Sequence, residues 1–410
     1  MAKILLLSTL DTKGKETAYL AGRIAACGCE PLVMDLSMRH GEERAAGIPP
    51  EKVAAAGGLN WEEVISSQER ARITEFMIKG AKRLAKDLLE EGKVQGIIGL
   101  GGSTGSLMAT EVMRALPFGL PKLMVSSTAA LPGLSTRYID TGDIALFHTV
   151  VEITGLSDLL KNLLDRAALS ICAMAKGAVT PLAGERDRGG KRIALTMLGP
   201  CEKCASRVRA ALEEWGYQVI GFSAAGVCDR AMEEMILHGL FDGVIDLAPG
   251  GVGEHLFGGM RDAGPNRLEG AGKMGLPQLI APCGVNHLTP PKSKYTAQDH
   301  KRRKYDLDRY RTWLRATPDE LRTMAVAFAD KLNAAKGAVV FFFPARGWSS
   351  VDGPGQPTHD PQEDRVFLEE LGARLSQGIQ VREVEANLED PAFAEALIRA
   401  SRELFGGALS

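Results

Sequence analysis

The sequence predicts an α/β protein made of two Rossmann-like, doubly wound lobes with mostly parallel sheets that face a central cleft. Three observations support this. Apolar runs typical of buried strands alternate with amphipathic helical stretches along most of the 410 residues. A chain of this length, with 45% hydrophobic residues, has enough material for two sizeable cores. A charged, glycine-bearing segment without periodicity, 184–191, separates two series of predicted strands.

The first lobe is predicted to span 1–183, the linker 184–191 and the second lobe 192–410. In the first lobe we expect strands at Lys3–Thr9, Pro31–Leu36, Gly96–Gly101 and Lys122–Ser127. The main helices between and after them are Ile73–Glu91, Gly105–Leu116 and Leu156–Lys176. In the second lobe the predicted elements are strands Arg192–Leu198, Gln218–Ala224, Gly243–Leu247, Gln278–Ala281, Gly337–Phe343 and Gln380–Glu385, followed by a helix at Pro391–Leu404.

Two pairs of segments repeat between the lobes in the same order. GIIGLGG (Gly96–Gly102) is echoed by GVIDLAPGG (Gly243–Gly251), and GLPKLMV (Gly119–Val125) is echoed by GLPQLIA (Gly275–Ala281). The repetition suggests two related lobes, although buried strands also share a limited vocabulary. Open parallel sheets bind ligands at the carboxyl ends of their strands, so we expect functional residues there.

Composition narrows the classes of function. The 49 basic and 51 acidic residues are nearly balanced, which argues against nucleic acid as a partner. HKRRK (His300–Lys304) is interpreted as a solvated loop rather than a phosphate-binding patch. No apolar run is long enough for a membrane helix, and the N-terminal run is a buried strand rather than a signal peptide. Seven cysteines in a long chain favour reduced thiols and a cytoplasmic location.

The segment GLGGSTG (Gly99–Gly105) is the first candidate binding element. It fits neither the dinucleotide fingerprint, because Thr104 stands at the third glycine position, nor a phosphate loop ending in Gly-Lys-Ser/Thr. Glycines allow close backbone approach, hydroxyls follow, and the next helix offers free N–H groups to an anion. Spacing alone leaves a phosphate loop and a plain tight turn equally open. The residues concerned are Gly101, Gly102, Ser103, Thr104 and Gly105.

Polar residues at neighbouring strand ends favour the phosphate interpretation. Lys13 could meet a phosphate, while Asp11 or Thr12 could cap a helix or touch a magnesium-bound water. Asp35 ends the second strand, where such folds often place a ribose-binding carboxylate. The other candidates at this edge are Ser126 and Ser127 for the nucleotide, and Asp140 and Asp143 for magnesium or positioning.

Several motifs together resemble an uncharacterised family of two-lobed proteins that includes the tomato mosaic virus resistance protein, whose N-terminal region is an ATP-binding module. The motifs are DTKGKE, GLGGSTG, MRALPFGLPKLMVS, GDI at Gly142–Ile144, DRAMEEMI and DGPGQPTHDP (Asp352–Pro361). The resemblance covers nearly the whole chain. It implies two Rossmann-like lobes, ATP and Mg²⁺ in the N-terminal lobe, and a homodimer or higher homo-oligomer.

The second lobe departs from that family pattern by losing hydroxyls and gaining thiols at successive strand ends. Three interpretations stay open for these residues: packing in the core, a soft-metal site for Zn²⁺ or an iron–sulfur cluster, and a nucleophilic Cys204 at a helix N-terminus. The candidate metal ligands are Cys201, Cys204, Cys228, His255, Cys283 and His287.

The leading functional hypothesis is an ATP-binding enzyme that acts on a small, anionic metabolite in the cleft between the lobes, by phosphorylation or ATP-driven activation. Arg230 and Arg346 would hold the substrate through its anionic group. The alternatives are a metal- or cysteine-dependent lyase or hydrolase centred on the second lobe, and a non-catalytic, ATP-dependent binding protein.

Overall fold

The computed structural model describes residues 1–40, 46–177 and 190–406. The chain divides into two compact units, Met1–Gly184 (unit 1) and Glu185–Ser410 (unit 2), each of which is described by itself. Residues 184–189 of the predicted linker lie outside the described residues. Among the described helices, none combines the length and apolar character that crossing a lipid bilayer requires.

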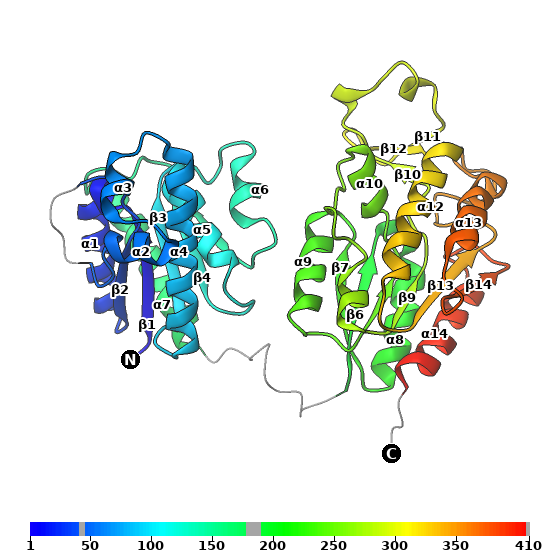
Figure 1. The fold of residues 1–410 in the computed structure, drawn as a ribbon, viewed down its shortest axis with the longest axis horizontal. Coiled ribbons are helices and arrows are strands. Elements are labelled where there is room, and N and C mark those ends of the chain that lie inside the picture. Colours follow the sequence, from blue (N-terminus) through cyan, green and yellow to red (C-terminus); the bar gives the residue numbers. More distant parts are fainter. Residues whose placement is uncertain (41–45, 178–189, 407–410) are drawn as a thin grey trace. The chain divides into compact units, whose positions relative to one another are not determined.

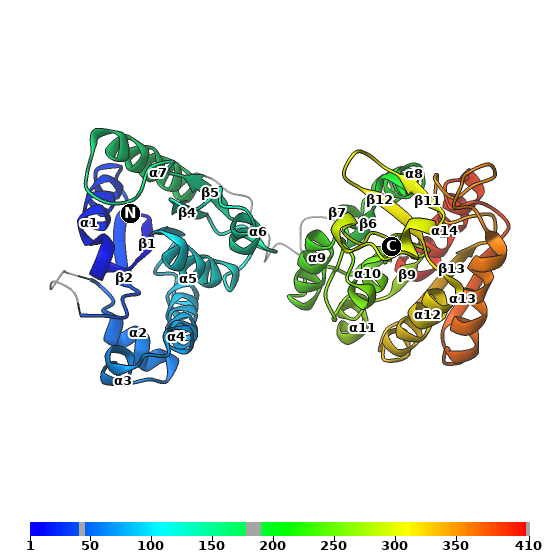
Figure 2. The same cartoon turned by 90° about the horizontal axis from the view of Figure 1, so that it is seen from above.

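Unit 1 is a five-stranded parallel sheet covered by helices on both faces (Figures 1 and 2). Its strands are β1 (Lys3–Ser8), β2 (Glu30–Asp35), β3 (Gly96–Gly101), β4 (Lys122–Ser126) and β5 (Ala145–His148), in the order β2-β1-β3-β4-β5. Its helices are α1 (Leu10–Ala26), α2 (Pro50–Gly57), α3 (Trp61–Ser66), α4 (Arg70–Glu90), α5 (Ser103–Arg114), α6 (Leu134–Ile139) and α7 (Asp158–Lys176).

The alternation of side chains along β1 explains the two layers of helices. Ile4 and Leu6 join the core beneath α1 and α7, whereas Leu5 and Leu7 join the core beneath α2, α4 and α5. Successive side chains of a strand point to opposite faces, so a strand that is apolar at every position is buried on both sides. The predicted parallel, doubly wound lobe is therefore confirmed.

Unit 2 repeats this plan in a six-stranded parallel sheet, in the order β14-β13-β9-β8-β6-β7. Its strands are β6 (Arg192–Met197), β7 (Gln218–Ser223), β8 (Gly243–Asp246), β9 (Gln278–Ile280), β13 (Val339–Pro344) and β14 (Gln380–Val384). Its helices are α8 (Glu202–Glu214), α9 (Val227–Leu237), α10 (Gly251–Phe257), α11 (Gly270–Met274), α12 (Pro318–Asn333), α13 (Pro361–Arg374) and α14 (Pro391–Phe405), with 3₁₀ turns η1 (Gly199–Cys201), η2 (Lys292–Lys294) and η3 (Asp299–Lys301).

The echoed segments occupy the same topological positions in the two sheets. In each unit the first strand lies between the second and the third, and the fourth follows the third. GIIGLGG forms the third strand of unit 1 and GVIDLAPGG that of unit 2, while the GLP segments lead into β4 and β9. The chain thus reverses direction across each sheet between its first and third strands, where open α/β sheets bind ligands.

Unit 2 adds a small antiparallel sheet that the sequence does not reveal. It consists of β10 (His287–Leu288), β12 (Thr312–Arg315) and β11 (Lys304–Asp306), in the order β10-β12-β11. The HKRRK segment is exposed except at Arg302, as its interpretation as a solvated loop predicts, although its last residue, Lys304, begins β11. Arg302 pairs with Asp299 and Glu320, and Arg303 pairs with Asp360 and Glu363.

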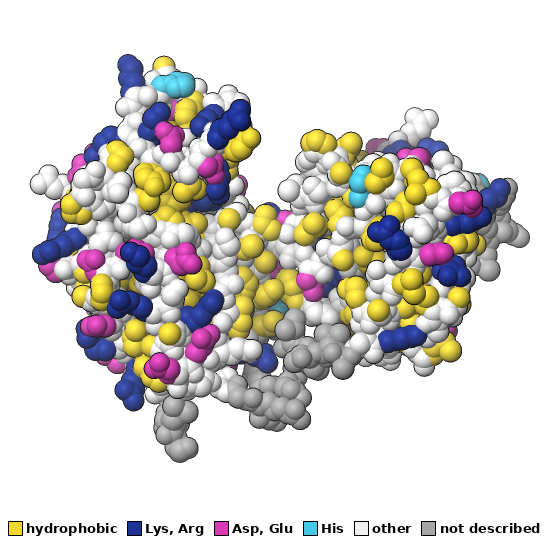
Figure 3. Space-filling view, turned by 180° about the vertical axis from the view of Figure 1, so that it is seen from behind, with side chains coloured by type: hydrophobic (Ala, Val, Ile, Leu, Met, Phe, Trp, Pro, Cys, Tyr) yellow, Lys and Arg dark blue, Asp and Glu magenta, His cyan; other side chains and the backbone are white. Residues whose placement is uncertain are grey.

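The surface charge fits the balanced composition. On the face shown in Figure 3, acidic and basic side chains are interspersed over each unit rather than gathered by sign. Nothing on this face resembles the one-sided basic surface that nucleic-acid-binding proteins present.

Candidate functional site

The candidate site is a pocket of about 550 Å³ at the carboxyl edge of the unit 1 sheet. The turn after β1, which contains Asp11, Thr12 and Lys13, and the loop after β3 form two of its sides. It therefore lies at the reversal between the first and third strands. The remaining lining residues are Thr9, Met38, Arg39, Arg70, Ala71 and Thr74, together with Gly102, Ser103, Thr104 and Gly105 of the loop.

The N-terminus of α5 opens into this pocket without a side-chain cap. Gly102 is the N-cap residue and no side chain makes a capping hydrogen bond there. The first N–H groups of a helix have no acceptor within the helix, so those of Ser103, Thr104 and Gly105 are available to a ligand. The positive end of the α5 dipole points in the same direction.

The two loop glycines, Gly101 and Gly102, have different structural roles. A Cβ on Gly101 would lie 2.9 Å from Gly105 Cα and 3.0 Å from the Gly105 carbonyl carbon, so the tight turn from strand to helix excludes a side chain. A Cβ on Gly102 would meet only Ser127 Oγ, at 3.8 Å, an ordinary contact. Gly101 is needed to form the turn, whereas Gly102 keeps the space in front of the helix open.

The neighbouring N-terminus of α1 is already satisfied by the protein. Leu10 N–H donates to Asp35 Oδ1 at 3.0 Å, and Asp11 N–H donates to Ser37 Oγ at 3.0 Å. Asp35 is buried, and this burial raises its pKa, although the hydrogen bonds it accepts act in the opposite direction. These contacts give Asp35 a structural role in fixing α1 in place of the expected ribose contact.

Lys13 lies at the mouth of the pocket with an internal counter-ion that the sequence did not indicate. Its Nζ lies 3.3 Å from Glu152 Oε1 and also donates to the Ile153 carbonyl. Ser127 Oγ donates to Glu152 Oε2 at 3.3 Å. Burial acts to raise the pKa of Glu152, but the hydrogen bonds from Ile153 N–H and Lys13 hold it below its usual value. Glu152 is 139 residues from Lys13, which is why no local motif points to it.

A network of hydroxyl groups supports the loop from inside the unit. Ser106 Oγ donates to Ser126 Oγ at 2.7 Å and to the Gly101 carbonyl at 3.3 Å. Tyr138 OH bridges Thr128 Oγ1, at 2.9 Å, to the Ser103 carbonyl, at 3.4 Å. Ser126 is fully buried, so it holds the loop in place and is not available as the predicted ligand contact.

The predicted magnesium role of Asp140 and Asp143 is wrong because both residues lie away from this edge. Asp143 pairs with Lys122 and accepts a hydrogen bond from Gly119 N–H, both at the amino end of β4. Asp140 follows α6, next to Arg137 and Tyr138, whose carbonyls accept hydrogen bonds from Arg114 at the C-terminal end of α5. A helix that follows a strand returns to the amino edge, so both aspartates precede β5 on that side of the sheet.

In unit 2, the glycine loop after β8 and the N-terminus of α8 are covered by other parts of the protein. A Cβ on Gly250 would lie 2.5 Å from the Gly284 carbonyl oxygen, and one on Gly251 would lie 2.6 Å from Ala263 Cβ. The glycine loop after β8 is therefore packed against protein. At the start of α8, Glu389 accepts hydrogen bonds from Lys203 N–H at 3.4 Å and Cys204 N–H at 3.0 Å.

Burial argues against a nucleophilic role for Cys204. Cys201, Cys204 and Cys283 are fully buried in one hydrophobic core. Burial raises the pKa of the Cys204 thiol, and the Cys201 hydrogen bond together with burial raises that of Cys283. A thiol held neutral in a core is inert. Packing, the plainest of the three interpretations, fits these cysteines.

The predicted metal ligands do not form one site. Cys228 is exposed on α9, and His255 Nδ1 lies 2.9 Å from Asp262 Oδ1. His287 is buried beside Arg261 and Arg315, and burial with these cations lowers its pKa well below the usual value. Nearby guanidinium groups also repel a metal cation. No group of three His, Cys, Asp or Glu side chains that could hold a metal ion occurs in residues 1–40, 46–177 and 190–406.

The predicted substrate arginines are also separated from the pockets. Arg346 is exposed and pairs with Glu385 at 2.8 Å. Arg230 lies on α9, where its side chain passes Gly264. Neither residue lines the pocket of unit 1 or the hollow at the carboxyl ends of β6 and β7 in unit 2.

Fold and site together define a two-domain α/β protein whose first domain presents an uncapped, glycine-rich helix N-terminus at the carboxyl edge of its sheet. The chain belongs to the uncharacterised protein family UPF0261, because the N-terminal domain of that family matches residues 2–180 and the C-terminal domain matches 190–405. The resemblance inferred from the motifs is thereby confirmed at the level of the family.

Individual relatives are similar along the whole chain. A UPF0261 protein of Clostridium tetani is 34% identical over 399 residues, covering 97% of each chain. The ToMV resistance protein Tm-1(GCR237) of Solanum lycopersicum is 26% identical over 421 residues, covering 98% of this chain and 56% of the tomato protein. Among solved structures, a putative UDP-N-acetylglucosamine 2-epimerase from Listeria monocytogenes aligns at 14% identity with a TM-score of 0.23, covering 68% of this chain and 79% of that one.

Proposed function

We propose that unit 1 binds the phosphates of ATP at the N-terminus of α5, and that the protein is an ATP-dependent enzyme acting on a small anionic metabolite. The observation that carries the proposal is the uncapped helix N-terminus facing a pocket at the strand reversal. Backbone N–H groups and the helix dipole favour an anion at such a position.

The cations around the pocket support a polyphosphate in particular. Lys13, Arg39 and Arg70 line it from three different segments. Arg70 Nη1 donates to the Met38 carbonyl at 3.1 Å, which leaves its other donors for a ligand, and Arg39 is exposed. Charge-assisted contacts from several sides suit a chain of phosphates better than a single carboxylate.

Apolar surface for the nucleoside adjoins the phosphate pocket. A second hollow of about 740 Å³ shares Ala71, Thr74 and Thr104 with it and continues between α4 and α5. Ile78 and Leu107 give this hollow an apolar wall. A nucleotide has a charged end and a flat, less polar end, and the two adjoining hollows match that division.

Asp11 is the residue of the pocket that supports magnesium. It lines the pocket, and its Oδ1 is buried without a hydrogen-bond partner among the described residues. Magnesium in nucleotide sites is held through one or two carboxylates, waters and the phosphates themselves. Asp11 takes this part in the proposal in place of Asp140 and Asp143.

Calorimetric titration with ATP and Mg²⁺ tests the binding. We expect Gly102→Val to weaken binding at least 10-fold, because a side chain there enters the space before the helix N-terminus, while the melting temperature without nucleotide stays close to wild type. Glu152→Gln frees Lys13 and should strengthen binding about 2- to 5-fold, the worth of a partly exposed ion pair. Wild type that takes up no ATP at millimolar concentration, or Gly102→Val that binds as well as wild type, would contradict the proposal.

Turnover is a separate measurement. ADP release that depends on an added carboxylate or phosphate metabolite supports the enzymatic part of the proposal. Binding without turnover across such a panel would instead support the non-catalytic, ATP-dependent binding protein that the sequence left as an alternative.

A further inference from the structure

We propose that unit 2 carries a second small-molecule site, for an organic anion with an apolar body. The site is a pocket of about 720 Å³ at the carboxyl ends of β6 and β7. Leu198 and Gly199 reach it directly after β6, and Ser223 and Ala225 at and after the end of β7. The added sheet β10-β12-β11 contributes Trp313 to its wall. None of the residues predicted from the second-lobe sequence lines it.

Arg209 supplies an unmatched positive charge at one end of the pocket. Its Nε is buried without a hydrogen-bond partner among the described residues, and its Nη2 contacts only the sulfur of Met197, at 3.5 Å. No described carboxylate pairs with it, unlike most arginines of this unit. Gly221 makes the space for the guanidinium, since a Cβ there would lie 2.4 Å from Nη2. A half-buried cation next to a pocket and without an acceptor favours an anionic ligand.

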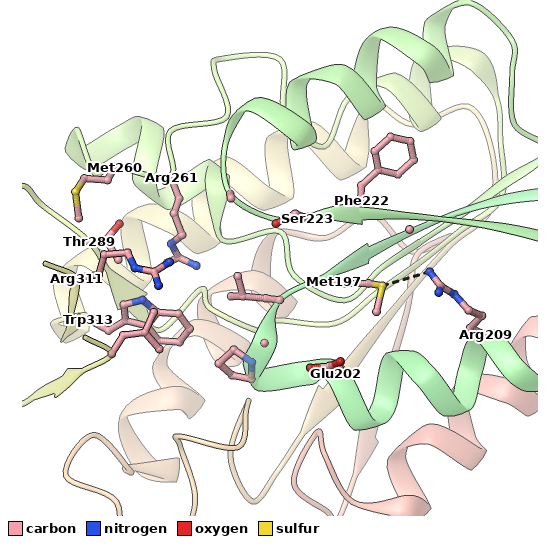
Figure 4. A pocket seen from close by; sticks show the side chains of 16 residues that line it. Met197, Glu202, Arg209, Phe222, Ser223, Met260, Arg261, Thr289, Arg311 and Trp313 are labelled. Carbon is pink, nitrogen blue, oxygen red and sulfur yellow. Dashed lines mark hydrogen bonds between the residues drawn. The ribbon is translucent and has the colours of Figure 1, made fainter. Parts of the chain in front are cut away.

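The other end of the pocket is a wall of side chains held together by hydrogen bonds and a cation–π contact. Arg261 Nε and Nη2 donate to Glu254 Oε1 at 3.0 and 2.7 Å, and the guanidinium lies 5.0 Å from the centre of the Trp313 ring. Thr289 Oγ1 donates to the same glutamate, at Oε2. Figure 4 shows Arg261, Trp313 and Thr289 together on one side of the pocket and Arg209 beside Met197 on the other. Arg311 also lines this end and pairs with Asp308. Because Glu254 neutralises Arg261 and Asp308 neutralises Arg311, this end offers flat packing surface more than charge.

The surface between the two ends is mostly apolar. Leu198 and Pro200 line it with the methionine chains of Met197 and Met260, and the exposed carboxylate of Glu202 lies at its edge. A ligand that satisfies both ends therefore carries a carboxylate, sulfonate or phosphate ester near Arg209 and an apolar or ring-shaped body that reaches toward Trp313. All lining residues belong to unit 2, so the site is independent of the nucleotide pocket.

The fluorescent anion 8-anilinonaphthalene-1-sulfonate has this chemistry and is the probe we would use. We expect wild type to bind it at one saturable site, and Arg209→Gln to weaken the binding at least five-fold. Ser223→Tyr, which fills the pocket from an exposed position, should abolish it. Arg207→Gln removes an exposed arginine of the same helix that does not line the pocket, and should bind like wild type.

Two further measurements separate this site from non-specific binding and from the nucleotide pocket. The uncharged N-phenyl-1-naphthylamine has the same ring body and should bind at least five-fold more weakly than the sulfonate. Gly102→Val should leave the sulfonate titration unchanged even though it weakens ATP. The proposal is overturned if wild type shows no saturable binding, if Arg209→Gln and Ser223→Tyr both bind like wild type, or if Gly102→Val alone removes the signal.

Discussion

Asp364, on α13, is a carboxyl group that the fold keeps away from water. It is fully buried, its Oδ1 accepts hydrogen bonds from Arg315 Nη2 at 2.6 Å and Asn286 Nδ2 at 3.0 Å, and its Oδ2 has no partner among the described residues. Burial, with the neighbouring Asp352, raises its pKa to about 8. The folded protein therefore holds a proton here at pH values where the unfolded chain has lost it.

This residue gives stability a specific dependence on pH. Between pH 4 and 8 the folded state binds more protons than the unfolded state at this position, so the free energy of unfolding falls as pH rises through that range. Asp364→Asn keeps the acceptor for Arg315 but cannot ionise. Wild type loses unfolding free energy between pH 5 and 8, and we predict that this loss is smaller in Asp364→Asn by at least about 1 kcal/mol. This is a cautious figure, because a pKa shift of a single unit already corresponds to about 1.4 kcal/mol. Urea unfolding at the two pH values measures it.

Asp360 provides the matched control at the start of the same helix. Burial acts to raise its pKa, but hydrogen bonds from Glu363 N–H and Arg303 hold it below the usual value. The stability that Asp360 contributes is fully present above its pKa in the unfolded chain and is lost as pH falls from there through its lower pKa in the folded protein. Asp360→Asn should lower stability by a similar amount at pH 5 and pH 8. If the free energy of unfolding changes equally between pH 5 and pH 8 in wild type and in Asp364→Asn, the raised pKa of Asp364 is ruled out.

Residues that act through distant partners were beyond the reach of the sequence. Lys13 and the glycine loop were predictable because strand ends in a parallel sheet meet at one edge. Glu152, which neutralises Lys13, and Glu389, which caps α8, come from segments 139 and 185 residues away. The prediction for Asp143 failed for another reason, because the sequence did not reveal β5. Nothing therefore indicated that Asp143 precedes a strand and lies at the amino edge of the sheet.

At the scale of elements, similar glycine loops are packed differently in the two units. The loop before α5 is open at Gly102, whereas the loop before α10 is closed by Gly284 and Ala263. The sequence echo predicted the shared strand–loop–helix unit, which is confirmed. It could not predict which loop stays open, because the packing partners lie on other strands and loops.

The capping of α8 by a distant carboxylate is itself testable. Glu389→Ala leaves the Lys203 and Cys204 N–H groups without their acceptor. We predict a loss of about 1 kcal/mol in the free energy of unfolding of unit 2, the usual worth of a helix N-cap. Glu385→Ala, which removes an exposed glutamate paired with Arg346, should change it by less than half as much. Thermal unfolding that shows no difference between the two variants would mean that the cap contributes nothing.

For the whole molecule, the sequence predicted the two parallel sheets and most of their strands. Near-continuous apolar runs identify strands buried on both faces, which is the strongest pattern in an α/β protein. The sheet β10-β12-β11 went unpredicted because its strands have two to four residues and lie among arginines and lysines. That sheet supplies Trp313, so the pocket of unit 2 was also invisible in the sequence.

The division of roles between the units is the central claim, and amide hydrogen exchange with and without ATP and Mg²⁺ tests it most directly. We predict that nucleotide slows exchange in peptides that contain residues 102–106. The peptides that contain 199–204 and 250–254 should not change, because their helix starts are capped or packed by the protein. Protection confined to unit 2, or none at 102–106 when ATP is bound, would contradict the claim.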